Sequence, residues 1–233
     1  RISYFYRILD DRIITISQQP STLISNFNID ENKNKINNFK KKNNLPLNYI
    51  FYPAMYFAHK NHRLIIEAIK MINMDENIKL SAIFCGKDKG LLKKLKNYST
   101  KLSVADKIIF LDYIKEEDLP LYYCNSEALV MPSLCGPTNI PPWEAFKLRV
   151  PVFYAKLEGI EDVLGNGAYY IDPLSPESLV EGLKKLFNND EFKKNLVNNG
   201  VKVLESTKTE IEFEKYFKKL NQVINIEQRK NFD

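Results

Sequence analysis

The stretch EALVMPSLCGPTNIPPWEAF, residues 127–146, joins a short apolar run that ends at Pro132 to a segment that begins at two prolines. The run EALVMP has near-continuous hydrophobic character, which is typical of a strand buried on both faces. Pro141 and Pro142 fit the first turn of a helix, where a missing N–H costs no hydrogen bond, and Glu144 complements the helix dipole. A buried strand followed by a helix is the repeating unit of an α/β sheet.

Units of the same kind lie on both sides of this stretch. Strands are expected over residues 49–54, 79–86, 107–113, 127–132, 150–155 and 168–172, and helices over 61–73, 88–101, 141–148, 159–164 and 176–187. The last helix has the clearest start, because Ser175 can cap it and Pro176 fits its first turn. The alternation predicts an α/β domain with a doubly wound, Rossmann-like parallel sheet.

The first 48 residues have a different character. Residues 1–29 contain an aromatic-rich helical stretch, the β-branched run RIITIS and the helical segment STLISNF, whereas residues 30–46 are polar and rich in Asn and Lys. The second composition is typical of a connector. We expect residues 1–48 to be the tail of a preceding domain and a linker, and residues 49–233 to form the Rossmann-like domain with C-terminal helices. The chain opens without Met or a signal-peptide pattern, which favours a piece of a longer protein.

The composition is that of an ordinary globular protein. Of 233 residues, 44% are hydrophobic and 27% are charged, and no apolar run approaches the roughly 18 residues that a membrane-spanning helix needs. The net charge of +5 fits an anionic ligand or peripheral contact with a membrane face, and both stay open. No nucleic-acid-binding pattern is present, so no nucleic-acid partner is expected. Cys85, Cys124 and Cys135 lack zinc or redox spacing, which favours the cytoplasm.

Ligands of such sheets bind beyond the carboxyl ends of the strands, so the loops there are the candidate sites. Lys60 lies just before a predicted helix, where its charge and the helix N–H groups could hold a phosphate. The alternative is an exposed lysine at the start of a helix. His59 and His62 lie three residues apart without a further acid or Cys at ligand spacing, so no metal site is expected.

Two other loops carry candidate residues. Gly86 follows a predicted strand and permits either close approach to a ligand or an ordinary turn, and no dinucleotide fingerprint surrounds it. In the stretch quoted first, Gly136 turns the chain and Thr138 and Asn139 can cap the helix. Glu144 would then accept hydrogen bonds from sugar hydroxyls at an anion-binding helix start, and the alternative is good capping alone.

Residues 49–205 resemble the C-terminal, nucleotide-sugar-binding half of the group 1 (family four) glycosyltransferases, which have the GT-B fold. Four blocks occur in the order of that family: YPAMYFAHKNHRLIIEAI, IIFLDYIKEEDLPLYYCNSEALVMPSLCGPTNIPPWEAF, VPVFYA and GNGAYYIDPLSPESL. The second block is the most specific, and its GPTN-x-PPxEA motif looks like a branch of the family. By this resemblance, residues 1–48 are a short remnant of the N-terminal acceptor domain and the linker.

The resemblance implies roles for individual residues. Lys60 and Glu144 would be the catalytic residues, with Lys60 on the donor diphosphate and Glu144 on the nucleotide ribose. The backbone around Thr138, Asn139 and Ile140 would hold the diphosphate. The donor base would lie against a further loop, formed by Tyr113, Ile114 and Lys115.

The sequence departs from the family pattern at two places. Gly136 stands where most members have the first of two glutamates, in a loop expected to contact the donor. Ala54 or Met55 stands where an arginine usually accompanies the lysine. Asp162 lies where the family often has a glutamate near the cleft.

The resemblance therefore implies a retaining, metal-independent glycosyltransferase without cofactors, which uses a nucleotide-diphosphate sugar as donor and a glycan or lipid-linked acceptor. The enzyme would work in the cytoplasm, with peripheral contact at the inner membrane face left open. The alternatives are a non-catalytic nucleotide-sugar-binding or scaffold protein and another GT-B-like enzyme, such as a nucleotide-sugar epimerase. Because most of the acceptor domain would be missing from this piece, the piece alone is expected to transfer sugar poorly or not at all.

Overall fold

The computed structural model describes residues 2–7, 9, 13, 17–136, 140–207 and 212–221. The chain divides into two compact units, one of them Pro20–Leu204 and the other formed by Arg1–Gln19 together with Glu205–Asp233. The larger unit contains the sheet.

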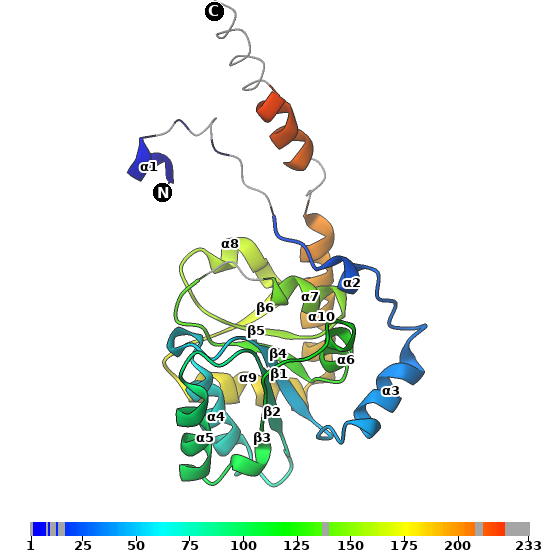
Figure 1. Cartoon of the computed structure of the whole chain (residues 1–233), viewed down its shortest axis with the longest axis vertical. Coiled ribbons are helices and arrows are strands. Elements are labelled where there is room, and N and C mark those ends of the chain that lie inside the picture. Colours follow the sequence, from blue (N-terminus) through cyan, green and yellow to red (C-terminus); the bar gives the residue numbers. More distant parts are fainter. Residues whose placement is uncertain are drawn as a thin grey trace, which may run out of the picture. The chain divides into compact units, whose positions relative to one another are not determined.

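Six parallel strands form that sheet, in the order β3-β2-β1-β4-β5-β6 (Figure 1). Their bounds are β1 Tyr49–Pro53, β2 Ser81–Cys85, β3 Ile108–Leu111, β4 Ala128–Met131, β5 Val152–Ala155 and β6 Ala168–Ile171. The predicted doubly wound sheet is confirmed. The strand order reverses between β1 and β4, which pair through Ile50 with Ala128 and through Phe51 with Leu129. The crevice at such a reversal is the usual place for a ligand.

Helices follow most strands and cover the sheet (Figure 1). Their bounds are α4 His62–Ile72, α5 Leu92–Lys101, α6 Leu119–Cys124, α7 Pro141–Lys147, α8 Ile160–Leu164, α9 Pro176–Asn188 and α10 Asp190–Ser206, with short 3₁₀ turns η2 Ala58–Lys60, η3 Ala105–Lys107, η4 Glu116–Asp118 and η5 Gly165–Gly167. All four residues of β4 and all four of β5 are buried. This burial explains the near-continuous apolar runs in the sequence, since a strand covered on both faces needs no polar alternation.

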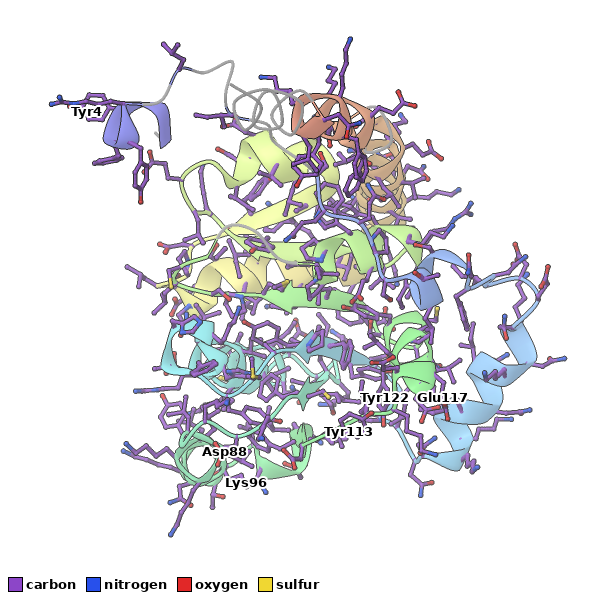
Figure 2. All side chains as sticks on the ribbon, turned by 45° about the horizontal axis from the view of Figure 1, so that its top comes forward. Tyr4, Asp88, Lys96, Tyr113, Glu117 and Tyr122 are labelled. Atoms are coloured by element: carbon purple, nitrogen blue, oxygen red, sulfur yellow. The ribbon has the colours of Figure 1, made fainter. Side chains whose placement is uncertain are left out.

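Side-chain hydrogen bonds shape the starts of α9 and α5. Ser175 Oγ accepts from the Ser178 N–H at 3.3 Å, so the predicted cap of α9 is confirmed. The helix expected from residue 88 begins later, at Leu92. Asp88, labelled in Figure 2, explains the delay, because its Oδ1 accepts from the N–H groups of three residues, Gly90, Leu91 and Leu92, at 2.8–3.0 Å. The intervening residues thus form a capped turn.

The polar segment expected to be a connector contains a ten-residue helix, α3 Lys33–Lys42, which follows the short α2 Thr22–Ser25. Ile36 of α3 is buried, and its carbonyl accepts from Asn125 Nδ2 at 3.0 Å. Phe39 packs edge-on against Tyr122 with ring centroids 5.1 Å apart. The composition hid this helix because only these two apolar residues face α6. The domain boundary near residue 48 stays a prediction.

The smaller unit contains α1 Ile2–Tyr6 and a helix over residues 212–221. Ser17 donates to the Glu212 carboxylate through its N–H at 2.8 Å and its hydroxyl at 3.2 Å. Most of the β-branched run RIITIS lies outside the described residues. Over the described ranges, every helix is too short or too polar to span a membrane.

Candidate functional site

Lys60 is placed by the segment that follows β1. The 3₁₀ turn η2 ends at Lys60, and α4 begins two residues later. The side chain is half-buried, and this burial lowers the pKa of the Lys60 ammonium, while the nearby Cys135 thiol acts in the opposite direction. A partly desolvated lysine at the start of an eleven-residue helix is suited to bind an anion.

Hydrogen bonds join the Lys60 segment to the segment that follows β4. The hydroxyl of Tyr52 donates to the Lys60 carbonyl and lies 3.0 Å from Ser133 Oγ. The His59 carbonyl accepts from the Leu134 N–H at 2.8 Å. These contacts place the two segments directly beside each other at the reversal of strand order.

Asn61 adds a connection to a third strand. Its backbone is left-handed, with φ of 55°, a conformation that asparagine tolerates better than most residues. Its side-chain amide donates to the carbonyls of Pro132 at 3.2 Å and Pro173 at 2.8 Å. One residue therefore holds together the segments that follow β1, β4 and β6.

His62 is part of the core beneath the site. Its ring is fully buried among Tyr52, Tyr56 and Phe84, with centroid distances of 4.9–5.1 Å. Burial lowers the pKa of His62 to about 4. His59 instead stacks on Phe57 with centroids 5.3 Å apart. The rings of His59 and His62 therefore lie in different environments, although the two residues are only three positions apart in the sequence.

Gly86 allows close approach of protein backbone. A Cβ at this position would lie 2.4 Å from the Ala54 carbonyl oxygen and 2.6 Å from Met55 N. The glycine therefore lets the segment after β2 pack against the segment after β1. Met55 is 45% exposed, whereas Ala54 is buried, so of these two neighbouring residues only Met55 lies at the surface.

Glu144 lies in α7, where the predicted prolines form the first turn. The residue is only 7% exposed, and its Oε2 accepts from the Tyr123 hydroxyl at 2.8 Å. Burial raises the pKa of the Glu144 carboxyl, and the hydrogen bond from Tyr123 opposes this rise. Burial holds the pKa of Tyr123 well above its usual value, so its hydroxyl keeps the proton that it donates.

Gly136 has a φ of 85°, the left-handed region in which a side chain is strained. Its carbonyl accepts from the Tyr154 hydroxyl at 3.3 Å. The backbone at residue 136 therefore favours glycine. Ile140 is the N-cap of α7 and has no side-chain cap. The predicted capping by Thr138 or Asn139 falls on residues outside the described part of the chain and stays a prediction.

The loop predicted to meet the donor base follows β3. Tyr113, labelled in Figure 2, is 76% exposed, and the Lys115 ammonium lies 3.9 Å from the Glu117 carboxylate. Ile114 is half-buried between them. Tyr56 connects this region to β1, because its hydroxyl donates to the Leu111 carbonyl at 2.8 Å.

The structure brings the Lys60 segment and the 132–136 segment together. The loop predicted to meet the donor base follows β3, the edge strand of the sheet, and β2 lies between β3 and β1. Asp162 is exposed on α8. Three residues that the sequence reasoning missed are Tyr52, Asn61 and Tyr123. Tyr52 and Tyr123 look like ordinary core aromatics in sequence, and their hydroxyl contacts span 81 and 21 residues. Asn61 directly follows Lys60, which is the one local signal of its role.

Comparison with known proteins agrees with this geometry. Residues 32–203 match the family of glycosyl transferases group 1. The chain is 27% identical over 183 residues to the O-antigen chain mannosyltransferase RfbU of Salmonella typhimurium, covering 75% of this chain and 50% of that protein. It thus spans about half the length of this curated relative.

Two solved structures share the fold. The C-terminal domain of the group 1 glycosyl transferase LpcC from Francisella tularensis has a TM-score of 0.63 and 16% identity, covering 85% of this chain and 97% of that one. Anabaena HepE in complex with UDP-glucose has a TM-score of 0.72 and 16% identity, covering 81% of this chain and 53% of that one. The sheet is that of the C-terminal, Rossmann-like half of a GT-B glycosyltransferase. Because the family match extends over most of the chain, the protein belongs to the group 1 glycosyl transferases.

Proposed function

We propose that this chain is the donor-binding part of a retaining, metal-independent glycosyltransferase, which takes a nucleotide-diphosphate sugar and transfers the sugar to a glycan or lipid-linked acceptor. The observation that carries the proposal is the placement of Lys60 and Glu144 after adjacent strands, β1 and β4, where the strand order reverses. Crevices at such reversals bind nucleotides in related α/β sheets.

In the proposed complex, Lys60 stabilises the diphosphate as leaving group. Negative charge grows on the leaving diphosphate as the bond to the sugar breaks, and a fixed cation beside it lowers the barrier. The N–H groups at the start of α4 add donors to the same anion. Lys60 is held for this task through its carbonyl by Tyr52 and through its neighbour Asn61. This charge from the protein itself is the basis for proposing a reaction without a metal ion.

Glu144 would bind the ribose of the donor. A carboxylate accepts hydrogen bonds from two adjacent hydroxyl groups, and the buried setting of Glu144 makes each bond stronger than it would be in water. The predicted contacts of Gly136, Thr138, Asn139 and Ile140 with the diphosphate remain part of the proposal. So do the contacts of the base loop at residues 113–115.

The proposed sugar is mannose, because the related RfbU is named a mannosyltransferase. The acceptor would be a growing surface polysaccharide, in line with the O-antigen chain in the name of that relative. The acceptor domain would come from sequence outside residues 49–205, and residues 1–48 would include its tail.

Nucleotide binding tests the proposal directly. Isothermal titration of the protein with UDP, GDP, ADP and their sugars, GDP-mannose among them, should show binding of at least one nucleotide. Lys60→Met should weaken diphosphate binding by about 1.5–3 kcal/mol, because a hydrogen bond to a charged group is lost. The same variant should bind a nucleoside without phosphates as wild type does.

Lys107→Met is a matched control for this charge. Lys107 lies just before β3, at the amino end of the sheet, and pairs with Asp106 at 2.9 Å. Lys107→Met removes one positive charge from the amino end of the sheet, opposite to the end where Lys60 lies. Nucleotide binding should therefore be unchanged. If Lys107→Met weakened binding as much as Lys60→Met, the effect would reflect net charge and the assignment of Lys60 would be wrong.

A non-catalytic nucleotide-sugar-binding protein is the second candidate. Gly136 and the Ala54–Met55 pair favour it, since by the resemblance they stand where the family usually has charged residues. Mass spectrometry of reactions with a donor and an acceptor panel separates the two. Transferred sugar, or slow release of free sugar from the donor, supports the enzyme; binding with neither product supports the second candidate.

A further inference from the structure

We propose that Tyr123 is a positioning residue, whose buried hydroxyl orients the Glu144 carboxylate for the ribose of the donor; the inference rests on the proposed function. Tyr123 lies in α6 and Glu144 in α7, on opposite sides of β4 in the chain. Neither the family match nor the sequence pattern points to this tyrosine as part of the site.

The hydrogen bond from Tyr123 restrains the carboxylate at one of its two oxygens. The Tyr123 hydroxyl donates to Glu144 Oε2 at 2.8 Å, and a carboxylate held at one oxygen presents the other, Oε1, to a ligand. The Tyr123 ring is itself fixed, since it is fully buried and packs edge-on against Phe51 with centroids 5.0 Å apart. A rigid donor on a rigid ring therefore fixes the acceptor before any nucleotide arrives.

Among the described residues, burial and the hydrogen bond from Tyr123 are what shift the pKa of Glu144. The elements with the most extensive packing against α7 are α2, β4 and β5, while α6 contributes Tyr123 and α10 contacts Phe146 of α7 through Gly200. Helix α2 and strand β4 carry no titratable side chain, and Tyr154 of β5 donates its hydroxyl to the Gly136 carbonyl instead. The hydrogen bond from Tyr123 thus stabilises the ionised form of Glu144 against the effect of burial. Removing it should raise the pKa of Glu144 further.

A comparison of two tyrosines separates positioning from mere stability. Tyr49 is also fully buried, and its hydroxyl donates to the Tyr122 carbonyl at 2.7 Å without touching Glu144. Tyr123→Phe and Tyr49→Phe each delete one buried hydroxyl and keep the ring. Both should lower the free energy of unfolding, but only Tyr123→Phe should change nucleotide binding.

The readout is binding of a ribonucleoside diphosphate and of its 2′,3′-dideoxy analogue, measured by isothermal titration from pH 5 to 8. Wild type should bind the ribonucleotide more tightly. Tyr123→Phe should reduce that preference by about tenfold, as expected for one charge-assisted hydrogen bond. As pH falls, Tyr123→Phe should also begin to lose ribonucleotide binding at a higher pH than wild type does. In a transfer assay, KM for the donor should rise while kcat stays close to wild type, because the contact exists in both ground and transition states.

Several results would overturn the inference. If Glu144→Gln loses the ribose preference while Tyr123→Phe keeps both the preference and the wild-type pH dependence, Tyr123 is only a core residue. If Tyr49→Phe matches Tyr123→Phe, the effect is one of stability. If wild type binds no nucleoside diphosphate, the proposed function fails and the inference with it.

A second variant covers the case in which Tyr123→Phe does not fold. Incorporation of 3-fluorotyrosine at position 123 keeps the ring and makes the phenol a stronger donor. Binding should then persist to a lower pH than in wild type, opposite to the shift in the Phe variant. An unchanged pH dependence in the fluorinated protein would contradict the positioning role.

Discussion

The hydroxyl groups of Tyr52 and Ser133 lie 3.0 Å apart in the interior, and their contact joins the segment after β1 to the segment after β4. Both side chains are almost fully buried. The Tyr52 hydroxyl also donates to the carbonyl of Lys60, so a single phenol holds the two halves of the proposed diphosphate site. The rigidity of the site therefore depends on core residues as well as on the loops themselves.

Tyr52→Phe should destabilise the protein by about 1–3 kcal/mol, because the partly buried Lys60 carbonyl and the buried Ser133 hydroxyl each lose a partner. Urea unfolding measures this change. Ser133→Ala and the double variant complete a cycle, and the two single effects should add to more than the double effect by roughly 1 kcal/mol. Strict additivity would show that the 3.0 Å contact contributes no coupling.

Asn61→Ala should be more harmful than Asn61→Gly. Both variants lose the hydrogen bonds to Pro132 and Pro173, but only alanine is strained at a φ of 55°. The difference between the two free energies of unfolding should be about 1–2 kcal/mol, the cost of left-handed backbone for a residue with a Cβ. Equal stabilities would mean that the backbone at Asn61 relaxes out of that conformation.

Gly86→Ala should lower stability by about 1–3 kcal/mol or more, since the new Cβ would meet the Ala54 carbonyl oxygen at 2.4 Å. Both contacting groups are backbone, so neither can rotate away. The same change should weaken nucleotide binding by shifting the Lys60 segment. Thermal unfolding and titration of the same sample measure both effects.

Gly90→Ala is the matched control for that change. Gly90 lies in the same loop with a φ of 88° and open space around its Cα. Its alanine variant suffers backbone strain without a clash, so it should cost about 1 kcal/mol and leave binding intact. A Gly90→Ala effect on binding as large as that of Gly86→Ala would argue against the proposed role of close packing.

His62 should make the protein sensitive to acid. Its pKa is about 4 in the folded state and 6.5 as the ordinary value, so the unfolded chain binds the extra proton as pH falls through this window. The free energy of unfolding should decrease between pH 6.5 and 4, by up to about 3 kcal/mol from this residue. Below about pH 4 the contribution stops changing, because both states are protonated.

His62→Phe isolates this effect from the titration of carboxyl groups. Phenylalanine suits the aromatic surroundings of Tyr52, Tyr56 and Phe84, and it carries no proton to lose. The variant should lose less stability than wild type between pH 6.5 and 4. His59→Phe should keep the wild-type acid sensitivity, because His62 is intact. Parallel curves for wild type and His62→Phe would contradict the burial argument.

Sequence reasoning predicted the sheet well and the polar segments poorly. The six strands were predictable because burial on both faces leaves continuous apolar runs. Helix α9 was predictable from Ser175 and Pro176, which act on adjacent residues. Helix α3 was not, since its helical character depends on packing of Ile36 and Phe39 against α6.

Some features of the candidate site could also be predicted from the sequence, and others could not. The sequence by itself determined the strands, the helix start after the double proline, and Lys60 and Glu144 as candidate ligand groups, because local pattern and loop position suffice for these. Only the tertiary structure decided that Tyr52 holds Lys60, that Tyr123 holds Glu144, and that Gly86 makes room for Ala54. Hydrogen bonds and steric contacts act over a few ångströms in space, and residues far apart along the chain leave no periodic signal of such contacts in the sequence.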